Sequence, residues 1–359
     1  MKNIKWIIGI IILVVVIVFV VQNKNSKRIV VQNDVIKIGA VLSLSGQAIN
    51  DGEAIKSGFD LAMSDLKEQG VNLEIIYSDD ETDPKKTVSS IQFLKTQNVQ
   101  AFAGFNWDFI YNTAIPVLDD NQLVNISPGN TSEYTSDKTY GFTSAPKTSY
   151  SKDLLVKFIN ENGIKKISFL GSRFPWSEVH LANLENAALE AGAEIVSIDW
   201  LQGGQEVDAI SSLIPKIKQK EPDLLFVMVG GDHAISALFK RVQQNQLNVP
   251  MIAGTTAIGR FVKDNQDVLG SDYSLYSLVP SSSDGFIRHF KEVTGKNPGE
   301  YTEYAYDAIL ILNRALQENG EEGLREYLEN NTFQGFSREY SFDENHDARD
   351  GLWQIRKDN

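Results

Sequence analysis

The chain has 359 residues, of which 42% are hydrophobic, 23% charged and 10% aromatic, a composition typical of a folded globular protein and unlike a disordered or collagen-like chain. It contains no cysteine, which excludes disulfides, thiol catalysis, iron–sulfur clusters and a lipidated N-terminal cysteine. The net charge is −13, and beyond residue 33 the chain carries 29 basic and 47 acidic side chains, so nucleic-acid binding is not expected.

The N-terminal segment contains an uncharged apolar run, Trp6–Val21, with basic residues on both sides. At 1.5 Å per residue the run covers roughly 24 Å, so it spans a bilayer core of about 30 Å only with help from its flanks. No Ala-x-Ala-like site follows it, which favours an uncleaved transmembrane anchor over a cleaved signal peptide. We expect residues 1–33 to form a membrane anchor or signal segment with its linker.

From Val35 onward, apolar strands alternate with amphipathic helices. Asp83 and Pro84 together resemble the N-cap and first residue of a helix. This succession predicts a parallel sheet with crossover helices. Strands are expected at 35–42, 73–77, 99–103 and 123–126, and helices at 55–66, 84–94 and 109–118.

The same pattern begins again after a polar stretch, residues 131–148. Two similar α/β units therefore follow one another, and we expect two lobes, each with its own sheet, with a cleft between them. In the second unit, helices are expected at 154–159, 179–191, 210–217 and 235–242, and strands at 166–170, 194–200, 224–229 and 250–253.

The loops that follow the strands are the places to look for a binding site. In open α/β sheets, ligands bind beyond the carboxyl ends of the strands, where loops and helix N-termini present free N–H groups. Six such loops are expected, at 43–52, 104–109, 127–131, 171–177, 230–233 and 254–257.

Four segments, taken in order, resemble the type I periplasmic binding protein family, in the branch that binds leucine, isoleucine and valine for ABC transporters. They are Val35–Gly46 (VIKIGAVLSLSG), Tyr77–Pro84 (YSDDETDP), Asn125–Tyr134 (NISPGNTSEY) and Tyr304–Leu316 (YAYDAILILNRAL). Their order and spacing make the combination more specific than any one of them.

The resemblance implies an α/β fold of two Rossmann-like lobes joined by three hinge crossings, which close on a small ligand. It places residues 34–143 and 281–335 in one lobe, and residues 144–280 and 336–359 in the other. Residues 342–355 would form a terminal hairpin packed on this second lobe.

The resemblance also implies site residues. Gly129 and Thr131 match a family loop that holds the α-carboxylate and α-ammonium of the ligand, and Thr131 has a hydroxyl that can donate. Trp107 and Asp108 stand where the family usually has small serines, and Trp176 falls in a loop that often carries an aromatic residue. Thr256 stands where many members have an acidic counter-ion for the ammonium, which puts leucine-type specificity in doubt.

A carboxylate from another loop could replace that counter-ion. Asp51, Asp108 and Asp232 lie on expected cleft loops, and a buried ammonium needs such a partner. Trp107 and Trp176 could cover a cation with their ring faces. Two alternatives stay open: the tryptophans could pack in the core or hinge, and Asp108 and Asp232 could cap the helices that follow.

No metal or cofactor is expected. The acidic residues of 79–83 precede Pro84 and favour a turn with a helix cap, while the alternating acids of 343–347 lack the glycine and glutamate that a calcium loop needs. The four histidines are scattered, and the hydrolase, dinucleotide and P-loop motifs are absent from the sequence.

These observations predict a binding protein, and an enzyme is not expected. We expect an extracytoplasmic solute-binding protein, tethered to the cytoplasmic membrane, that delivers an amino acid or related small amine to an ABC transporter permease. The alternative is a receptor of the same fold that signals to a membrane partner.

Overall fold

The structure is a computed structural model that describes residues 35–130, 138–265 and 274–358. The described residues from Ile36 onward form one compact unit. The anchor or signal segment expected at residues 1–33 lies outside the described residues. Within the described ranges, no helix has both the length and the apolar character that a bilayer crossing requires.

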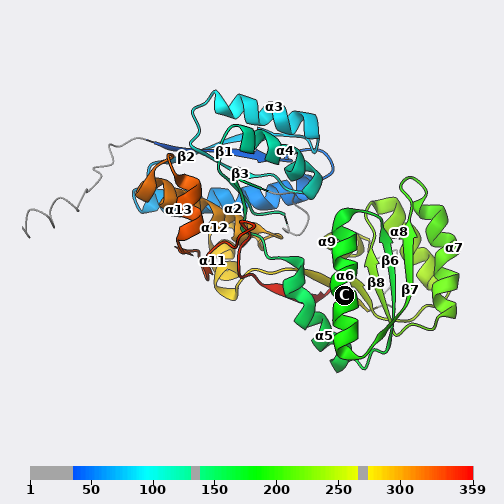
Figure 1. Cartoon of the computed structure of the whole chain (residues 1–359). Coiled ribbons are helices and arrows are strands. Elements are labelled where there is room, and N and C mark those ends of the chain that lie inside the picture. The colour runs from blue at the N-terminus through cyan, green and yellow to red at the C-terminus, as the bar shows by residue number, and fades with distance from the viewer. Residues whose placement is uncertain (1–34, 131–137, 266–273, 359) are drawn as a thin grey trace, which may run out of the picture. The chain divides into compact units, whose positions relative to one another are not determined.

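The first sheet is parallel throughout, and its strands follow the order β2-β1-β3-β4-β5 (Figure 1). The edge strand β5 has only three residues. It lies within the stretch 131–148, where the sequence analysis expected no strand. The strands are β1 (Ile36–Leu42), β2 (Leu73–Asp79), β3 (Ala101–Gly104), β4 (Asn125–Ser127) and β5 (Gly141–Thr143).

Helices cover both faces of this sheet because its strands are apolar on both sides. In β1, Ile38 and Ala40 face one core and Val41 faces the other, as the two-residue period of a strand requires. The first core also takes the apolar faces of α2 (Ile49–Glu68) and α12 (Thr302–Asn319), and the opposite core takes those of α3 (Pro84–Lys95) and α4 (Asp108–Asp120).

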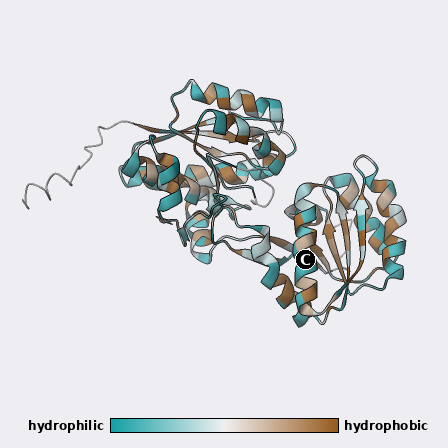
Figure 2. Ribbon diagram, in the orientation of Figure 1, coloured by the Kyte–Doolittle hydropathy of each residue, from teal (hydrophilic) through white to brown (hydrophobic). Residues whose placement is uncertain are grey.

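The second sheet follows the order β13-β10-β9-β8-β6-β7 and is parallel except for its edge strand β13. Figure 2 shows hydrophobic residues along its central strands and hydrophilic stretches on the covering helices. The strands are β6 (Lys166–Ser172), β7 (Glu194–Leu201), β8 (Leu224–Met228), β9 (Met251–Ala253), β10 (Leu275–Pro280) and β13 (Trp353–Lys357).

The helices of the second sheet also divide between its two faces. The 3-10 turn η2 (Thr148–Ser151) leads into this part of the chain. One face carries α5 (Lys152–Glu161) and α6 (Pro175–Ala191), and the other carries α7 (Glu206–Gln219), α8 (Asp232–Gln244) and α9 (Thr256–Asp264).

The chain returns to the first sheet after β10. Apolar residues of its later helices join the first core, as does the short hairpin that follows them. These elements are α11 (Asp284–Thr294), α12, α13 (Leu324–Asn330), β11 (Phe333–Gln334) and β12 (Glu339–Tyr340). We call residues 36–143 with 284–349 the first lobe, and residues 148–280 with 353–357 the second lobe.

The sequence analysis expected residues 336–359 in the second lobe. In the structure, the hairpin around residues 342–348 packs on the first lobe instead. Phe342 and Ala348 are buried in the first core, and the Thr143–Asp347 bridge continues the edge of the first sheet. Only the final strand, β13, joins the second sheet. The hairpin packs on Phe142 of the first sheet, because the ring centroids of Phe142 and Phe342 lie 4.9 Å apart.

Three short segments connect the lobes, at 144–147, 281–283 and 350–352, and we call them the crossings. The two-lobe architecture agrees with the sequence expectation, and so do the boundaries of most elements. Asp83 is the N-cap of α3 and accepts a hydrogen bond from the Lys85 N–H, while Gly192 ends α6 in the left-handed region at φ 67°.

Candidate ligand-binding site

The loop that follows β1 is held by acidic residues at the end of β2. The Asp79 carboxylate accepts hydrogen bonds from the N–H groups of Leu44 and Ser45, at 2.9 and 3.2 Å. Asp80 accepts one from the Ser43 hydroxyl at 2.6 Å. The acidic segment therefore organises a turn and a neighbouring loop, as the sequence indicates, and no group of metal-ligating side chains was found among the residues that the structure describes.

The hydrogen bonds also affect the charge of this loop. Desolvation favours the neutral form of Asp79, but the donors from Glu81, Ser45 and Leu44 outweigh it and lower the pKa of this carboxyl. Asp79 therefore stays ionised at neutral pH, and its charge continues to hold the loop.

The first turn of α2 packs directly on this loop. A Cβ at Gly52 would overlap the carbonyl oxygen of Ser43, so only glycine fits there. This close approach places Asp51 beside the loop that follows β3. The Trp107 indole N–H donates to the Asp51 carboxylate at 2.8 Å, so two residues predicted for the site, 56 positions apart, lie together.

Asp51 also forms an ion pair with the second lobe. Its second carboxylate oxygen lies 3.3 Å from Nη1 of Arg260, on α9. The Asp51 side chain is 16% exposed and that of Arg260 is 44% exposed. The carboxylate thus contacts the indole of one lobe and the guanidinium of the other.

Arg260 was missed by the sequence analysis. It lies three residues beyond the loop in which a site residue was expected, and nothing in its immediate sequence distinguishes it from a solvated helix residue. Its expected neighbour Thr256 is the first residue of α9, and the side chain of Thr256 lies outside the described part of the structure.

Two buried asparagines lie at the ends of β3 and β4 and were also missed. The Asn106 Oδ1 accepts a hydrogen bond from the Ser43 N–H at 3.1 Å, while its Nδ2 has no hydrogen-bond partner among the described residues. Neither side-chain polar atom of Asn130 has a described partner, and both residues are fully buried. An unpaired buried amide costs free energy, which makes it a ready donor or acceptor for a ligand.

Gly129 lies between these asparagines in the structure. A Cβ there would come within 2.6 Å of Ile55 Cδ1 and 3.2 Å of Asn106 Cβ. The loop therefore lies close to α2, and a larger residue at this position would require the Ile55 side chain to move. Thr131, the expected hydroxyl donor in the same loop, lies outside the described residues.

Asp108 and Asp232 begin helices but are not their N-cap residues. Trp107 and Gly231 occupy the caps of α4 and α8, at φ 74° and 81°, and each aspartate is the first helical residue. A carboxylate in the first turn interacts favourably with the helix dipole. Asp232 is exposed, whereas Asp108 is partly buried.

Trp176 packs on the second lobe. Its ring is stacked on that of Phe174, with centroids 6.1 Å apart, and it lies against the apolar core that α5 and α6 cover. Because Phe174 is 49% exposed, this aromatic pair forms part of the lobe surface next to the end of β6. No described contact joins Trp176 to Asp51 or Trp107.

Glu300 adds a further carboxyl near Asp51, from the segment before α12. Its Oε1 is shielded from solvent and has no hydrogen-bond partner among the described residues. Burial, followed by the negative charge of Asp51, raises the pKa of Glu300 to about 8, although Arg260 and Arg356 oppose the shift. Glu300 is therefore mostly protonated at neutral pH.

The alternating acids of the later hairpin are paired with lysines. Asp343 accepts hydrogen bonds from the N–H groups of Asn345 and Asp347, and it lies 2.5 Å from the Lys147 ammonium. Asp347 forms a buried ion pair with Lys138. The alternating acids therefore have a structural role: they link the hairpin to Lys138 and Lys147.

Comparison with known proteins identifies the family. Two α/β lobes joined by three crossings, with polar loops at the ends of their strands, define a bilobal α/β protein. The sequence profile of the family described as "Periplasmic binding protein" matches residues 35–357, and the chain belongs to that family. The resemblance found in the sequence is thereby confirmed.

The chain is similar to two curated relatives of the branched-chain amino-acid branch. It is 23% identical over 304 residues to the Leu/Ile/Val-binding protein homolog 2 of Brucella abortus (strain 2308), covering 79% of each chain. It is also 23% identical over 297 residues to the leucine-specific-binding protein of Salmonella typhimurium, again covering 79% of each.

Solved structures share the fold at low sequence identity. An ABC transporter substrate-binding protein from Desulfitobacterium hafniense in complex with Leu has a TM-score of 0.73 and 20% identity, covering 90% of this chain and 97% of that one. A solute-binding protein from Rhodopseudomonas palustris BisB5, in complex with 3,4-dihydroxybenzoic acid, has a TM-score of 0.71 and 20% identity, covering 91% and 93%.

Proposed function

We propose that the protein is the extracytoplasmic solute-binding component of an ABC transporter, and that it captures an amino acid or related small amine between its lobes. One observation carries the proposal: the Asp51 carboxylate contacts Trp107 of the first lobe and Arg260 of the second. A group that both lobes contact is placed to couple ligand binding to lobe position. Membership of the periplasmic binding protein family supports the same function.

The mechanism requires no covalent chemistry. A ligand that contacts both lobes binds more tightly to the closed arrangement than to an open one, and binding therefore shifts the population toward closure. The permease then distinguishes the loaded form by its shape. Tethering through the segment before residue 34 would keep the protein near its permease.

The polar groups of the site suggest the chemistry of the ligand. Asp51 and Asp108 offer negative charge to an ammonium, while Arg260 and the Asn106 amide offer donors to a carboxylate. An amino acid carries both groups, and its ammonium can take the place of Arg260 beside Asp51. Relatives named for leucine, isoleucine and valine support this class.

A thermal-shift screen of the purified full chain tests the proposal. The panel contains the common amino acids, small amines and aromatic acids, the last because one structural relative is complexed with a dihydroxybenzoate. A ligand at 100 times its Kd stabilises the folded state by about 2.7 kcal/mol, which raises the midpoint measurably. We expect an amino acid to do so, and a panel without any stabilising compound would contradict the proposal.

A further inference from the structure

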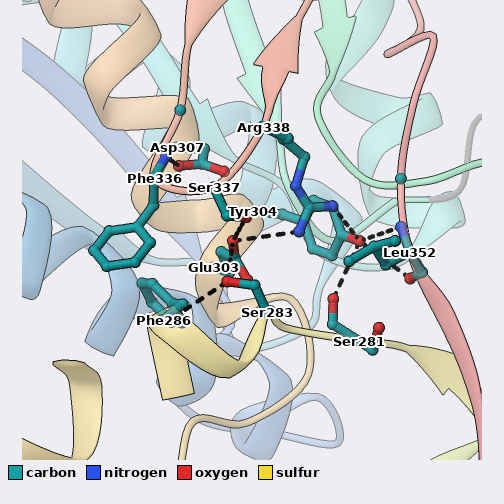
Figure 3. Close-up of polar contacts among 12 residues, drawn as sticks. Ser281, Ser283, Phe286, Glu303, Tyr304, Asp307, Phe336, Ser337, Arg338 and Leu352 are labelled. Carbon is teal, nitrogen blue, oxygen red and sulfur yellow. Dashed lines mark hydrogen bonds and ion pairs between the residues drawn. The ribbon is translucent and has the colours of Figure 1, made fainter. Parts of the chain in front are cut away.

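Tyr304, near the start of α12, contacts all three crossings. Its carbonyl oxygen accepts a hydrogen bond from the Ser144 hydroxyl of the first crossing at 3.1 Å. Its own hydroxyl lies 3.3 Å from the Ser281 carbonyl oxygen of the second crossing and accepts a bond from the Leu352 N–H of the third at 2.9 Å. Figure 3 shows Leu352 beside this hydroxyl and Ser281 below it.

The Tyr304 hydroxyl has more partners than it can satisfy at once. The Leu352 N–H and Arg338 Nη1, each at 2.9 Å, both donate to it and use its two acceptor positions. Its single proton then has two acceptors within reach, the carbonyl oxygens of Ser281 at 3.3 Å and Leu352 at 3.1 Å. Because these belong to different crossings, the proton can bond only one crossing at a time.

Arg338 and Glu303 fix the tyrosine in the first lobe. The guanidinium lies 4.7 Å from the centroid of the Tyr304 ring, and its Nη2 is 3.3 Å from Glu303 Oε1, although not aligned for a hydrogen bond. Both charged side chains are buried, at 6% and 0% exposure. The position of the ring is therefore set by a cation and its counter-ion within one lobe.

Glu303 also ties the second crossing to the same cluster. Its carboxylate accepts hydrogen bonds from the Ser283 N–H at 2.5 Å and from the Ser283 hydroxyl at 3.1 Å (Figure 3). The backbone of Ser281 is in turn bonded to the third crossing, because its N–H donates to the Leu352 carbonyl oxygen at 2.9 Å. The crossings are thus linked to one another and to α12.

We propose that Tyr304 is the positioning residue about which the lobes turn. Its ring stays fixed in the first lobe, while its hydroxyl proton passes between the carbonyl oxygens of Ser281 and Leu352 as the crossings shift. Each arrangement keeps one hydrogen bond from the hydroxyl, so movement between them leaves no buried hydroxyl unsatisfied. This inference rests on the proposed function, because that function requires the lobes to move.

The variant Tyr304→Phe removes the hydroxyl and keeps the ring that packs under Arg338. The second and third crossings then lose their shared partner, while the Ser144 hydroxyl keeps its bond to the main-chain carbonyl oxygen, and we expect the lobes to sample a wider range of separations. We also expect the affinity for L-leucine, used as the probe ligand, to fall about tenfold, because the closed arrangement is less favoured.

Pulsed EPR on the full chain measures the distribution of lobe separations directly. The sequence has no cysteine, so Gln92→Cys on α3 and Lys240→Cys on α8, both at exposed positions, give two spin-label sites without background. Tyr306→Phe is the matched control, since its hydroxyl lies on the same helix and donates to Asp65 within the first lobe. It should keep the wild-type width.

The proposal is overturned if Tyr304→Phe folds and shows the wild-type width of the ligand-free distribution. Should that variant fail to fold, 3-fluorotyrosine at position 304, which keeps the hydroxyl and changes only its strength as a donor and acceptor, takes its place, and an unchanged width there overturns the proposal. The ligand-free width does not depend on any ligand. A wild-type chain that binds no amino acid therefore counts against the proposed function alone.

Discussion

At the scale of single residues, the role of Asp51 depends on partners that are far away in the sequence. The sequence predicts a carboxylate on the loop before a helix, but its partners Trp107 and Arg260 lie 56 and 209 positions away. Proximity to Trp107 follows from the parallel sheet, since β1 and β3 are neighbours and their loops meet at one edge. Proximity to Arg260 depends on the second lobe and could not be predicted.

The variant Asp51→Asn is expected to lower the affinity for the ligand found in the thermal screen by at least about tenfold. The amide can still accept the indole hydrogen bond, but it no longer offers a negative charge to an ammonium. Stability should change by less than about 1 kcal/mol, because the ion pair with Arg260 is partly exposed. Isothermal titration calorimetry measures the affinity.

Asp60→Asn is the matched control for this substitution. Asp60 lies on the same helix and pairs with Lys56 at 2.6 Å, away from the loops that follow β1 and β3. Its replacement should leave the affinity unchanged. Equal affinities of the Asp51→Asn variant and the wild type would show that Asp51 does not contribute to ligand binding.

At the scale of elements, the close packing of α2 on the loop after β1 positions the candidate site. The strands and helices themselves could be predicted because the apolar periods of two and 3.6 residues are clear in the sequence. The carboxylates that hold the loop, Asp79 and Asp80, could be assigned to a turn but not to Leu44 or Ser45, because hydrogen bonds between segments leave no periodic signal. The three-residue strand β5 was missed because it is too short to show alternation.

The variant Gly52→Ala is expected to destabilise the protein by about 2 kcal/mol or more, because the new methyl group would overlap the Ser43 carbonyl oxygen. Ligand affinity should fall with stability, since the overlap moves Asp51. Gly230→Ala has open space around its Cβ and should be neutral. Urea unfolding of both variants measures the difference, and equal midpoints would show that α2 can move without cost.

At the scale of the whole molecule, two carboxyl groups make stability depend on pH. Burial is the main cause that raises the pKa of Glu300 to about 8 and that of Asp307 to about 7, from ordinary values of 4.5 and 3.8. The folded state therefore binds more protons than the unfolded state between about pH 4 and pH 8. Stability from these groups is greatest at the acidic end of that range and falls as the pH rises.

The variant Glu300→Gln is expected to lose less stability than the wild type between pH 5 and pH 8. Its amide is neutral at every pH, whereas the shielded Glu300 carboxyl must ionise as the pH rises. Thermal midpoints measured across that range test the prediction. Glu53→Gln, which replaces an exposed glutamate on α2, should follow the wild-type curve. A Glu300→Gln curve parallel to the wild type would show that Glu300 ionises in the folded protein as it does in water.

The discontinuous first lobe has a consequence for how the protein is made. Helix α12 is central to its core, yet it is separated from β1–β5 by the whole second lobe. On the ribosome, the second lobe can assemble its parallel strands as soon as they emerge, whereas the earlier strands must wait for α12 with one apolar face uncovered. The first lobe of the nascent chain therefore remains incompletely folded until synthesis is almost finished, even when the second lobe has already formed.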